Sequence, residues 1–402
     1  MMYDLGGTYR AHEPGDTLAR LEPLLWNTFG ISRVANITGL DNINLPTYVA
    51  IRPLSKLVTT SQGKGITHDL AKISAIMESI EGWHAERIPK ADVVGTYRHL
   101  KGKKNLVDLG KLPLSDGFQL KEQVFDDVNF AWLKGIELNS GQEIYFPKCL
   151  IDLNTEILHR KSDNYNFFFG CSSNGLASGN TYEEAVCHGI YEAIERDNWA
   201  ISEWNPKQKR KIDASTIISP HLKDILEQLN TRDIHLEITD ATNKIGVPVY
   251  TAVVSDPTGI HALGSFSGAG CHLSSVVALS RAITEAIQAR LTFVAGTRDD
   301  CYPSVYQALQ NSWQQLTSQQ LHNRAITSSK KRYPFIETSV PGDFTLCIDR
   351  LLKQLNHAGY EQVIVYEHTQ KDIQIPVVHV IVPGLVYDRQ AHTNHAYFPE
   401  CL

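Results

Sequence analysis

The sequence of 402 residues predicts an α/β fold in which mixed sheets are covered by helices, organised around three similar helical phrases. The phrases are AKISAIMESIE (71–81), AVCHGIYEAIE (185–195) and ALSRAITEAIQ (278–288). Short runs rich in β-branched and aromatic residues lie between them, as is typical of strands. Because the phrases are widely spaced, they indicate three quasi-equivalent helices in one fold and argue against a solenoid.

The polar positions of each phrase fall at i, i+4 and i+7, which places them on one face of a helix. The remaining positions are apolar or small, so each helix should be mostly buried yet carry a polar, largely acidic stripe. Buried carboxylates need a partner because desolvating them is costly. The stripes therefore favour cation binding, with an exposed, salt-bridged helix face as the equal alternative. The stripe residues are Ser74, Glu78, Glu81, His188, Glu192, Glu195, Arg281, Glu285 and Gln288.

A glycine-bearing segment that we expect to be a loop precedes each phrase: TTSQGKG (59–65), CSSNGLASG (171–179) and SFSGAGC (265–271). Glycine lets backbone N–H groups approach an anion, and a helix N-terminus favours negative charge. Combined with the acidic stripes, these segments predict a site for a nucleoside triphosphate and Mg²⁺, which binds oxygen ligands. No Walker A or G-x-G-x-x-G motif is present, so neither a P-loop nor a Rossmann fold is expected.

Composition sets limits on function. A hydrophobic content of 42% and a charged content of 20% are ordinary for a globular protein. The net charge of -6 argues against an extended nucleic-acid surface. We expect a cytoplasmic protein without a membrane segment, since no signal peptide is evident and the apolar stretch 375–387 is short. Seven cysteines without a C-x-x-C pair favour reduced thiols and argue against a zinc site.

The N-terminal part begins with a helix predicted at 14–30, capped by Asp16 or Thr17 and closed by Gly30. Strands are predicted where apolar residues alternate or form short runs, at 31–40, 46–53 and 144–153.

The later part continues with cap signals and helical periodicity. Helices are predicted at 183–204, 212–233 and 349–359. Strands are predicted at 234–239, 248–254 and 375–385. The polar segment 302–342 should be a surface excursion. Because no long linker is present, we expect one domain over 1–402, with an N-terminal part (1–58), a nucleotide-binding core (59–300) and a C-terminal α/β part (301–402).

Several of these motifs together resemble the YcaO family. They are SAIMESIE, HGIYEAIERDNW and SRAITEAIQARL, with GISRVANITGLDNINLP near the start and VIVPGLV near the end. The resemblance covers nearly the whole chain, and its motifs follow one another in the family's order. It implies an ATP-binding α/β fold, unrelated to P-loop proteins, that uses ATP and Mg²⁺ to activate a backbone amide of a peptide or protein.

The resemblance also implies site residues. Those expected to bind ATP and Mg²⁺ are Ser74, Glu78, Glu81, Asn180, Glu184, Glu192, Glu195, Arg196, Glu285 and Gln288. The expected metal ligands among them are Glu78, Glu81, Glu192 and Glu195. Arg10 and Thr17 resemble a basic and hydroxyl pair near the nucleotide. We add Lys64 and Arg281 as cations for phosphate. No residue is identified as the catalytic base.

Family members differ in the nucleophile that attacks the amide. Sulfide gives a thioamide, a neighbouring Cys, Ser or Thr gives an azoline, and an N-terminal amine gives a macrocyclic amidine. This chain ends HAYFPECL, with Pro399 in place of the Pro-rich tail typical of azoline-forming members, and we expect no fused substrate-docking domain. Both departures favour the thioamide branch, which acts on a peptide with a separate TfuA-type partner. A homodimer would suit the family, and a nucleotide-binding accessory subunit is the alternative from another class.

Overall fold

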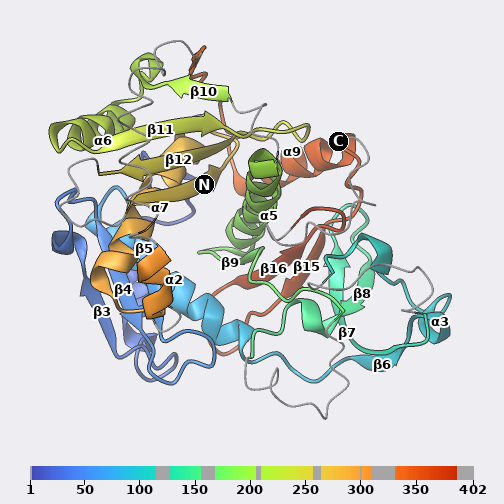
Figure 1. The fold of residues 1–402 in the computed structure, drawn as a ribbon. Helices are drawn as coiled ribbons and strands as arrows, with labels where there is room; N and C mark the ends of the chain where they lie inside the picture. The colour runs from blue at the N-terminus through green and yellow to red at the C-terminus, as the bar shows by residue number, and fades with distance from the viewer. Residues whose placement is uncertain are drawn as a thin grey trace. The chain divides into compact units, whose positions relative to one another are not determined.

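The computed structural model describes residues 2–114, 126–154, 168–204, 210–256, 264–298, 301–308, 311 and 331–386. Contacts divide the chain into two compact units, which are described separately (Figure 1). Unit 1 comprises 1–79, 206–243 and 247–340, and unit 2 comprises 80–205, 244–246 and 341–402. Of the segment 302–342, predicted as a surface excursion, residues 309–310 and 312–330 lie outside the described residues, whereas 333–334 form a strand and Phe335 is buried in the core, which corrects the expectation there.

A five-stranded sheet forms one part of unit 1, in the order β13-β12-β11-β10-β14. Its pairs are antiparallel except for β10 with β14. The strands are β10 (Arg210–Asp213), β11 (His235–Asp240), β12 (Val249–Ser255), β13 (Ser265–Cys271) and β14 (Tyr333–Pro334). Helices α6 (Pro220–Thr231) and α7 (Ser275–Ala295) share one apolar core with this sheet. The strands expected at 234–239 and 248–254 are thereby confirmed within one residue.

The N-terminal part of unit 1 contains a three-stranded antiparallel sheet of β3 (Arg33–Asn36), β4 (Thr47–Ile51) and β5 (Thr60–Lys64). A hairpin of β1 (Tyr3–Asp4) and β2 (Tyr9–Arg10) precedes it. Helix α1 (Pro14–Leu21) is shorter than the helix predicted at 14–30, because Pro23 follows it in a 3₁₀ turn, Glu22–Leu24. Its cap is Glu13, not Asp16 or Thr17, while Gly30 does adopt the expected positive φ of 68°.

All three predicted glycine loops contain strand residues, which corrects the expectation, and 171–179 includes the short strand β9 (Leu176–Ser178). The segment 59–65 contains β5, and 265–271 is β13. A Cβ on Gly63 would lie 2.0 Å from the backbone nitrogen of Ala75 in α2 (His68–Ala85). A Cβ on Gly270 would lie 2.0 Å from the carbonyl oxygen of Ala278 in α7. These glycines therefore allow a strand backbone to lie directly against a helix, a use of glycine that a sequence pattern does not separate from a loop.

Unit 2 is organised around a sheet in the order β6-β7-β15-β16-β9, with β8 paired to β7. The strands are β6 (Val93–Thr96), β7 (Asn129–Glu137), β8 (Glu143–Pro147), β9 (Leu176–Ser178), β15 (Ile364–Glu367) and β16 (Val377–Ile381). Its helices are the end of α2, α3 (Tyr97–Leu100), α5 (Tyr182–Trp204) and α9 (Phe344–His357). The helices expected at 183–204 and 349–359 are confirmed, and Gly359 ends the latter with a φ of 92°.

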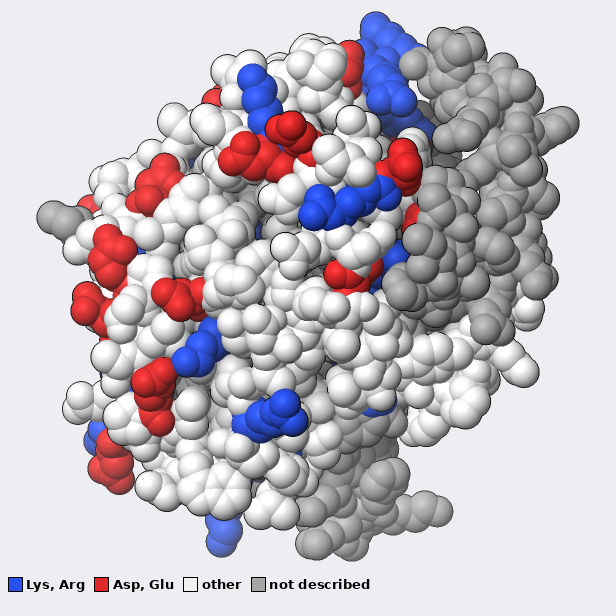
Figure 2. Space-filling model, turned by 90° about the vertical axis from the view of Figure 1, so that its left-hand side faces the viewer, with Lys and Arg blue, Asp and Glu red and all other residues white. Residues whose placement is uncertain are grey.

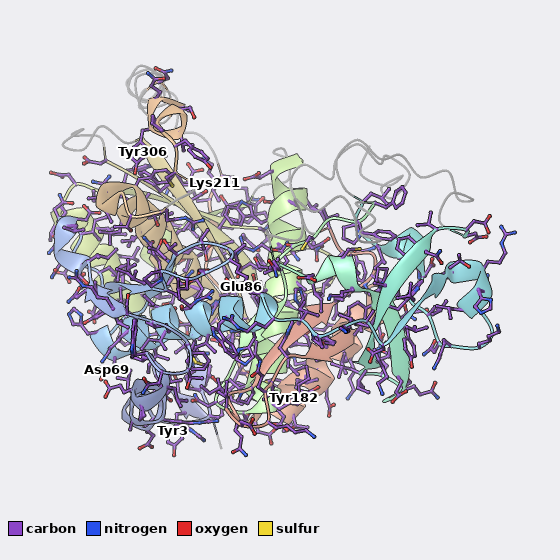
Figure 3. All side chains as sticks on the ribbon, turned by 90° about the horizontal axis from the view of Figure 1, so that it is seen from below. Tyr3, Asp69, Glu86, Tyr182, Lys211 and Tyr306 are labelled. Carbon is purple, nitrogen blue, oxygen red and sulfur yellow. The ribbon has the colours of Figure 1, made fainter. Side chains whose placement is uncertain are left out.

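Close packing also fixes α5 against the sheet of unit 2. A Cβ on Gly189 would lie 2.6 Å from a methyl carbon of Val380, so only glycine lets the helix approach at this point. Near the other end of α5, the Asp197 carboxylate accepts the backbone N–H of Val386 at 2.9 Å. Tyr182 at the start of α5 is labelled in Figure 3. Two positions of the helix, Gly189 and Asp197, are therefore held against residues 380 and 386 of unit 2.

Candidate functional site

The burial pattern of the three helices matches the stripes predicted from their spacing. Each helix is buried on most of its surface, and nearly all stripe positions are half-buried or exposed. Glu195 is the exception, because it is only 2% exposed. The accessible stripe residues are Ser74, Glu78, Glu81, His188, Glu192, Arg281, Glu285 and Gln288. Polar groups on otherwise buried helices are compatible with ligand binding, and two of the stripe carboxylates, Glu192 and Glu285, also form ion pairs within the chain.

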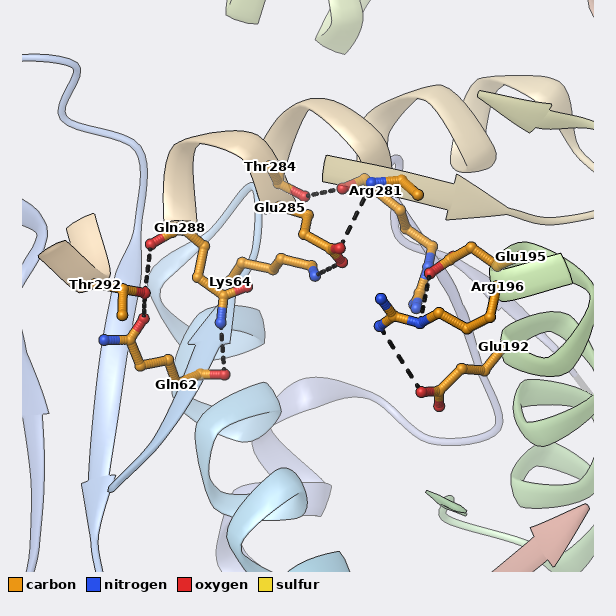
Figure 4. Close-up of polar contacts among 11 residues, drawn as sticks. Gln62, Lys64, Glu192, Glu195, Arg196, Arg281, Thr284, Glu285, Gln288 and Thr292 are labelled. Atoms are coloured by element: carbon orange, nitrogen blue, oxygen red, sulfur yellow. Dashed lines mark hydrogen bonds and ion pairs between the residues drawn. The ribbon is translucent and has the colours of Figure 1, made fainter. Parts of the chain in front are cut away.

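Helix α5 gathers two carboxylates around one guanidinium in unit 2 (Figure 4). Arg196 Nη2 lies 3.9 Å from Glu192 Oε1, and Arg196 Nε lies 3.9 Å from Glu195 Oε1. The spacings i, i+3 and i+4 put the three side chains on neighbouring turns. Glu192 is 19% exposed and Glu195 only 3% at the side chain. Glu192 therefore offers an accessible carboxylate beside the buried carboxylate of Glu195, and the Arg196 guanidinium lies near both.

The segment before α5 positions two more of the expected residues. Asn180 Nδ2 donates to Glu184 Oε2 at 3.3 Å, and the Glu184 backbone N–H bonds to Thr181 Oγ1 at 3.2 Å. Glu184 is 3% exposed. Because its oxygen is already hydrogen-bonded, Glu184 is suited to orient Asn180. The helix start therefore presents a fixed amide group.

Glu81 at the end of α2 is held by β9, a contact that the sequence analysis missed. Its Oε1 accepts the backbone N–H of Ser178 at 2.8 Å and the Ser178 hydroxyl at 2.6 Å. The two residues are 97 positions apart, so only the fold reveals the pair. In the sequence, this contact was signalled only by the place of Ser178 in the glycine-bearing segment CSSNGLASG. Both hydrogen bonds fix the carboxylate in one orientation.

In unit 1, β5 and α7 are joined by a series of polar contacts (Figure 4). Lys64 Nζ lies 2.5 Å from Glu285 Oε2, and the backbone N–H of Ala269 approaches Glu285 Oε1 at 3.5 Å. Gln288 Nε2 donates to the carbonyl oxygen of Gln62 at 2.8 Å. The expected phosphate-binding lysine thus contacts an expected ATP-site carboxylate, which spacing did not predict.

Arg10 and Arg281 are brought close to the same buried histidine in unit 1. His272 is stacked on Tyr9, with ring centroids 5.6 Å apart. Burial, together with the positive charges of Arg281 and Arg10, lowers the pKa of His272 to about 3. His272 Nδ1 accepts the backbone N–H of Ser274, so the neutral ring carries its proton on Nε2. Two guanidinium groups near a neutral imidazole create a positive region suited to an anion.

The remaining expected residues take different positions. Thr17 is 3% exposed, and its hydroxyl donates to the carbonyl oxygen of Glu13 at 3.2 Å, within the first turn of α1. That contact is a local i to i−4 bond from a side chain to the helix backbone. Ser74 and Glu78 lie on the accessible side of α2, half-buried and exposed respectively. The Glu78 side chain is therefore accessible from solvent.

The donor set fits Mg²⁺ and does not fit zinc. Among the described residues, no group of three or more His, Cys, Asp or Glu side chains is assembled for a metal ion. Mg²⁺ is commonly held by one or two carboxylates and completed by water and phosphate oxygens, so a preassembled cage is not required. Structural zinc, in contrast, is held by four protein ligands.

Electrostatics outside these groups are unremarkable. On the face drawn in Figure 2, acidic and basic side chains of the described residues are interspersed. No helix in the described part of the chain is long and apolar enough to cross a bilayer. Neither observation points to a second site of a different class.

Comparison with known proteins agrees with the resemblance. A family model described as YcaO cyclodehydratase, ATP- and Mg²⁺-binding, matches residues 62–386. The chain is 32% identical over 391 residues to a protein in the tfuA 3′ region of Rhizobium leguminosarum bv. trifolii, covering 94% of this chain and 89% of that relative.

Two solved structures share the fold. The YcaO of Methanopyrus kandleri, bound with AMPPCP and Mg²⁺, gives a TM-score of 0.70 at 21% identity, covering 96% of this chain and 94% of that chain. A heterocyclase in complex with substrate and cofactor gives a TM-score of 0.73 at 22% identity, covering 94% of this chain and 53% of that chain. The present chain therefore spans about half of that heterocyclase. The predicted fold, neither P-loop nor Rossmann, is confirmed.

Proposed function

The chain belongs to the YcaO family, whose model describes ATP and Mg²⁺ binding, and from this premise we propose that it uses ATP to phosphorylate a backbone amide oxygen of a peptide, with a sulfur donor giving a thioamide. The observation that carries the proposal is the accessible acidic stripe on buried helices. A buried helix face bearing carboxylates is costly unless cations reach it, and Mg²⁺ with a nucleotide supplies them.

The balanced reaction needs ATP and sulfide for each amide. Hydrosulfide adds to the amide carbon, and the resulting oxyanion attacks the γ-phosphorus, releasing ADP. The C–O bond then breaks, so the former amide oxygen leaves in inorganic phosphate, while the hydrosulfide proton also leaves with the phosphate. Phosphoryl transfer of this kind depends on alignment and charge neutralisation more than on covalent help from the protein.

The proposed residue roles follow from their chemistry. Mg²⁺ would neutralise phosphate charge and align the oxygens, held by carboxylates from Glu78, Glu81, Glu192 and Glu195. Arg196, between Glu192 and Glu195, would stabilise charge on the transferred phosphoryl group. Other residues proposed to contact the nucleotide are Ser74, Asn180, Glu285, Gln288, Arg10, Lys64 and Arg281, while the buried Glu184 would orient Asn180 and the buried Thr17 would support the start of α1. We assign no catalytic base.

The choice of product rests on the relatives. The protein in the tfuA 3′ region supports thioamide formation with a TfuA-type partner. Azoline formation is the second candidate, supported by the cyclodehydratase description of the family and by the heterocyclase of similar fold. The two candidates share the same ATP step and differ only in the nucleophile.

The experiment that tests the ATP step compares Glu192→Gln with Glu227→Gln. Glu227 is an exposed glutamate of α6 and serves as a matched control. Because Gln cannot supply a charged oxygen ligand to Mg²⁺, we expect Glu192→Gln to abolish peptide-dependent ATP turnover while its circular dichroism stays unchanged. Glu227→Gln should retain wild-type turnover. Full turnover by Glu192→Gln would contradict the assignment, and nucleotide binding without any modified peptide would indicate an accessory subunit.

A further inference from the structure

The first hairpin of the chain depends on the rest of unit 1 for its position. Strands β1 and β2 contain two residues each, and Tyr3 pairs with Arg10 while Asp4 pairs with Tyr9. A two-stranded hairpin of this size is at best marginally stable by itself in water. Arg10, which the proposed function places near phosphate, is the last residue of β2. Its position therefore depends on what the hairpin packs against.

Two contacts place the hairpin on other elements of unit 1. In the turn, a Cβ on Gly7 would lie 2.8 Å from Ser280 Oγ, so the turn lies directly on α7. In β2, the Tyr9 ring is stacked on the His272 ring, with centroids 5.6 Å apart and planes inclined by 10°. Stacked rings contribute an energy that corresponds to roughly two- to tenfold in an equilibrium constant. Because Tyr9 directly precedes Arg10, the stack is the contact nearer to the guanidinium.

His272 is itself fixed by the start of α7. The residue is 7% exposed, and its Nδ1 accepts the backbone N–H of Ser274 at 2.9 Å. Ser274 caps α7, because its hydroxyl oxygen accepts the backbone N–H of Val277. Burial and the charges of Arg281 and Arg10 lower the pKa of His272 to about 3, so the ring is neutral and adds no third positive charge beside them. A rigid, uncharged ring thus supports Tyr9.

We propose that His272 is a positioning residue, which holds Arg10 in reach of the triphosphate through the stacked ring of Tyr9. The inference rests on the proposed function for the role of Arg10, and on the hairpin contacts alone for the link from His272 to Arg10. The His272 side chain makes two separable contacts: the ring stacks on Tyr9, and Nδ1 bonds to the start of α7. Positioning depends on the ring, whereas a merely structural role at the helix start depends on Nδ1.

Two substitutions separate these contacts. His272→Phe keeps an aromatic ring for Tyr9 and loses the acceptor for Ser274, whereas His272→Asn keeps a side-chain oxygen as acceptor and loses the ring. We expect His272→Asn to weaken binding of Mg-ATP to the full chain, measured by calorimetry, about fivefold. His272→Phe should stay within about twofold of wild type. The reverse order of the two variants would overturn the proposal.

The same comparison is available from the other ring, which decides the question if His272→Phe does not fold. Tyr9→Phe keeps the stack and loses only the hydroxyl that donates to Asp4 Oδ2 at 3.0 Å, so it should bind Mg-ATP like wild type. Tyr9→Leu loses the stack and should weaken Mg-ATP binding about fivefold. Equal affinities of these two variants would contradict a role of the stack.

A double variant tests whether His272 acts through Arg10. Arg10→Met should weaken Mg-ATP binding at least about tenfold, because a charge-assisted hydrogen bond to phosphate is lost. Adding His272→Asn to Arg10→Met should cause no further loss, since the group that His272 positions is already gone. A further loss of about fivefold in that background would refute positioning, because His272 would then act on the nucleotide by another route.

A second measurement does not depend on nucleotide. Trypsin cleaves after Arg10, and cleavage requires the hairpin to leave α7 for a moment, so the rate at which fragment 1–10 forms reports how firmly the hairpin is held. We expect this rate to rise about fivefold in His272→Asn and to stay unchanged in His272→Phe. His235→Asn, at an exposed histidine of β11, is the matched control and should change neither measurement.

The two measurements also separate this inference from the proposed function. Equal cleavage rates in wild type and His272→Asn are incompatible with the proposal, whatever the affinity for Mg-ATP. If wild type binds no Mg-ATP, the proposed function fails at its nucleotide step, and the cleavage rates still decide whether His272 holds Arg10 in place.

Discussion

Replacing Gly63 by Ala should separate β5 from α2 and thereby disturb the acidic stripe. The added Cβ would lie 2.0 Å from Ala75 N and 2.2 Å from Ala71 O, whereas ordinary contact begins at 3.4 Å. The helix therefore has to move away by about 1.4 Å, the difference between 3.4 Å and 2.0 Å. Overpacking of this kind costs about 1–3 kcal/mol, and we expect the upper end because backbone atoms cannot rotate aside.

Two measurements test how Gly63→Ala affects stability and ATP turnover. Urea denaturation monitored by circular dichroism should show unit 1 of the Gly63→Ala protein unfolding with about 3 kcal/mol less stability. Peptide-dependent ATP turnover should fall about a hundredfold, because Ser74 and Glu78 move with α2. Gly15→Ala is the control, since nothing lies within 4 Å of that glycine in α1, and it should be neutral or slightly stabilising. A Gly63→Ala protein with wild-type stability and turnover would refute the packing argument.

Two further predictions concern buried charges and protons. Arg290→Met removes the guanidinium that bonds Asp41 at 2.8 Å and Asp256 at 3.4 Å. The substitution should lower the free energy of unfolding, measured by urea denaturation, by about 3–5 kcal/mol, and Asp41→Asn in the same background should restore part of that loss. An unchanged free energy of unfolding in Arg290→Met would contradict this prediction. Burial lowers the pKa of His379 to about 4, although the bond from its Nε2 to Asn174 O favours the charged form. In the unfolded chain the pKa of this histidine is near 6.5, so the unfolded chain binds the proton at a higher pH than the folded protein does. The free energy of unfolding is therefore highest above pH 6.5 and falls as the pH decreases toward 4. At pH 5 this group should lower the free energy of unfolding by about 2 kcal/mol relative to neutral pH. His379→Gln should reduce the pH dependence of the free energy of unfolding by that amount. An equal slope in both proteins would contradict the prediction.

The helices and their stripes were predictable because they depend on local periodicity. Three residues spaced at i, i+4 and i+7 share a face in any α-helix, so Glu192 and Glu285 were placed correctly without knowledge of their neighbours. The end of α1 was missed although its signal, Pro23, is in the sequence, and the 3₁₀ turn that follows it shortened the predicted helix.

The roles of the glycines and the pairing of the charges were not predictable in the same way. Gly63 and Gly270 gave the same signal as a flexible loop, while their actual role depends on a helix that packs against the strand. The pair of Lys64 with Glu285 joins residues 221 positions apart, and that of Glu81 with Ser178 joins residues 97 apart. Such contacts depend on strand order and helix packing, which periodicity does not encode.

The proposed function and the ion pairs address the same question, namely how carboxylates are stabilised before a ligand arrives. Glu285 has a lysine, Glu192 an arginine and Glu81 two hydrogen bonds from β9. Each partner stabilises the negative charge, as a desolvated carboxylate requires. These partners would therefore offset part of the desolvation cost of the carboxylates before metal and nucleotide arrive.

The central claim is tested most directly by the intact mass of a candidate peptide, taken from the genomic neighbourhood, after incubation with this protein, Mg-ATP and sulfide, with and without a TfuA-type partner. The account predicts a gain of about 16 Da, oxygen replaced by sulfur, that requires ATP; a loss of about 18 Da would indicate azoline formation by the same ATP step. An unchanged mass in every combination, despite tight binding of Mg-ATP, would contradict the claim that this chain activates a peptide amide.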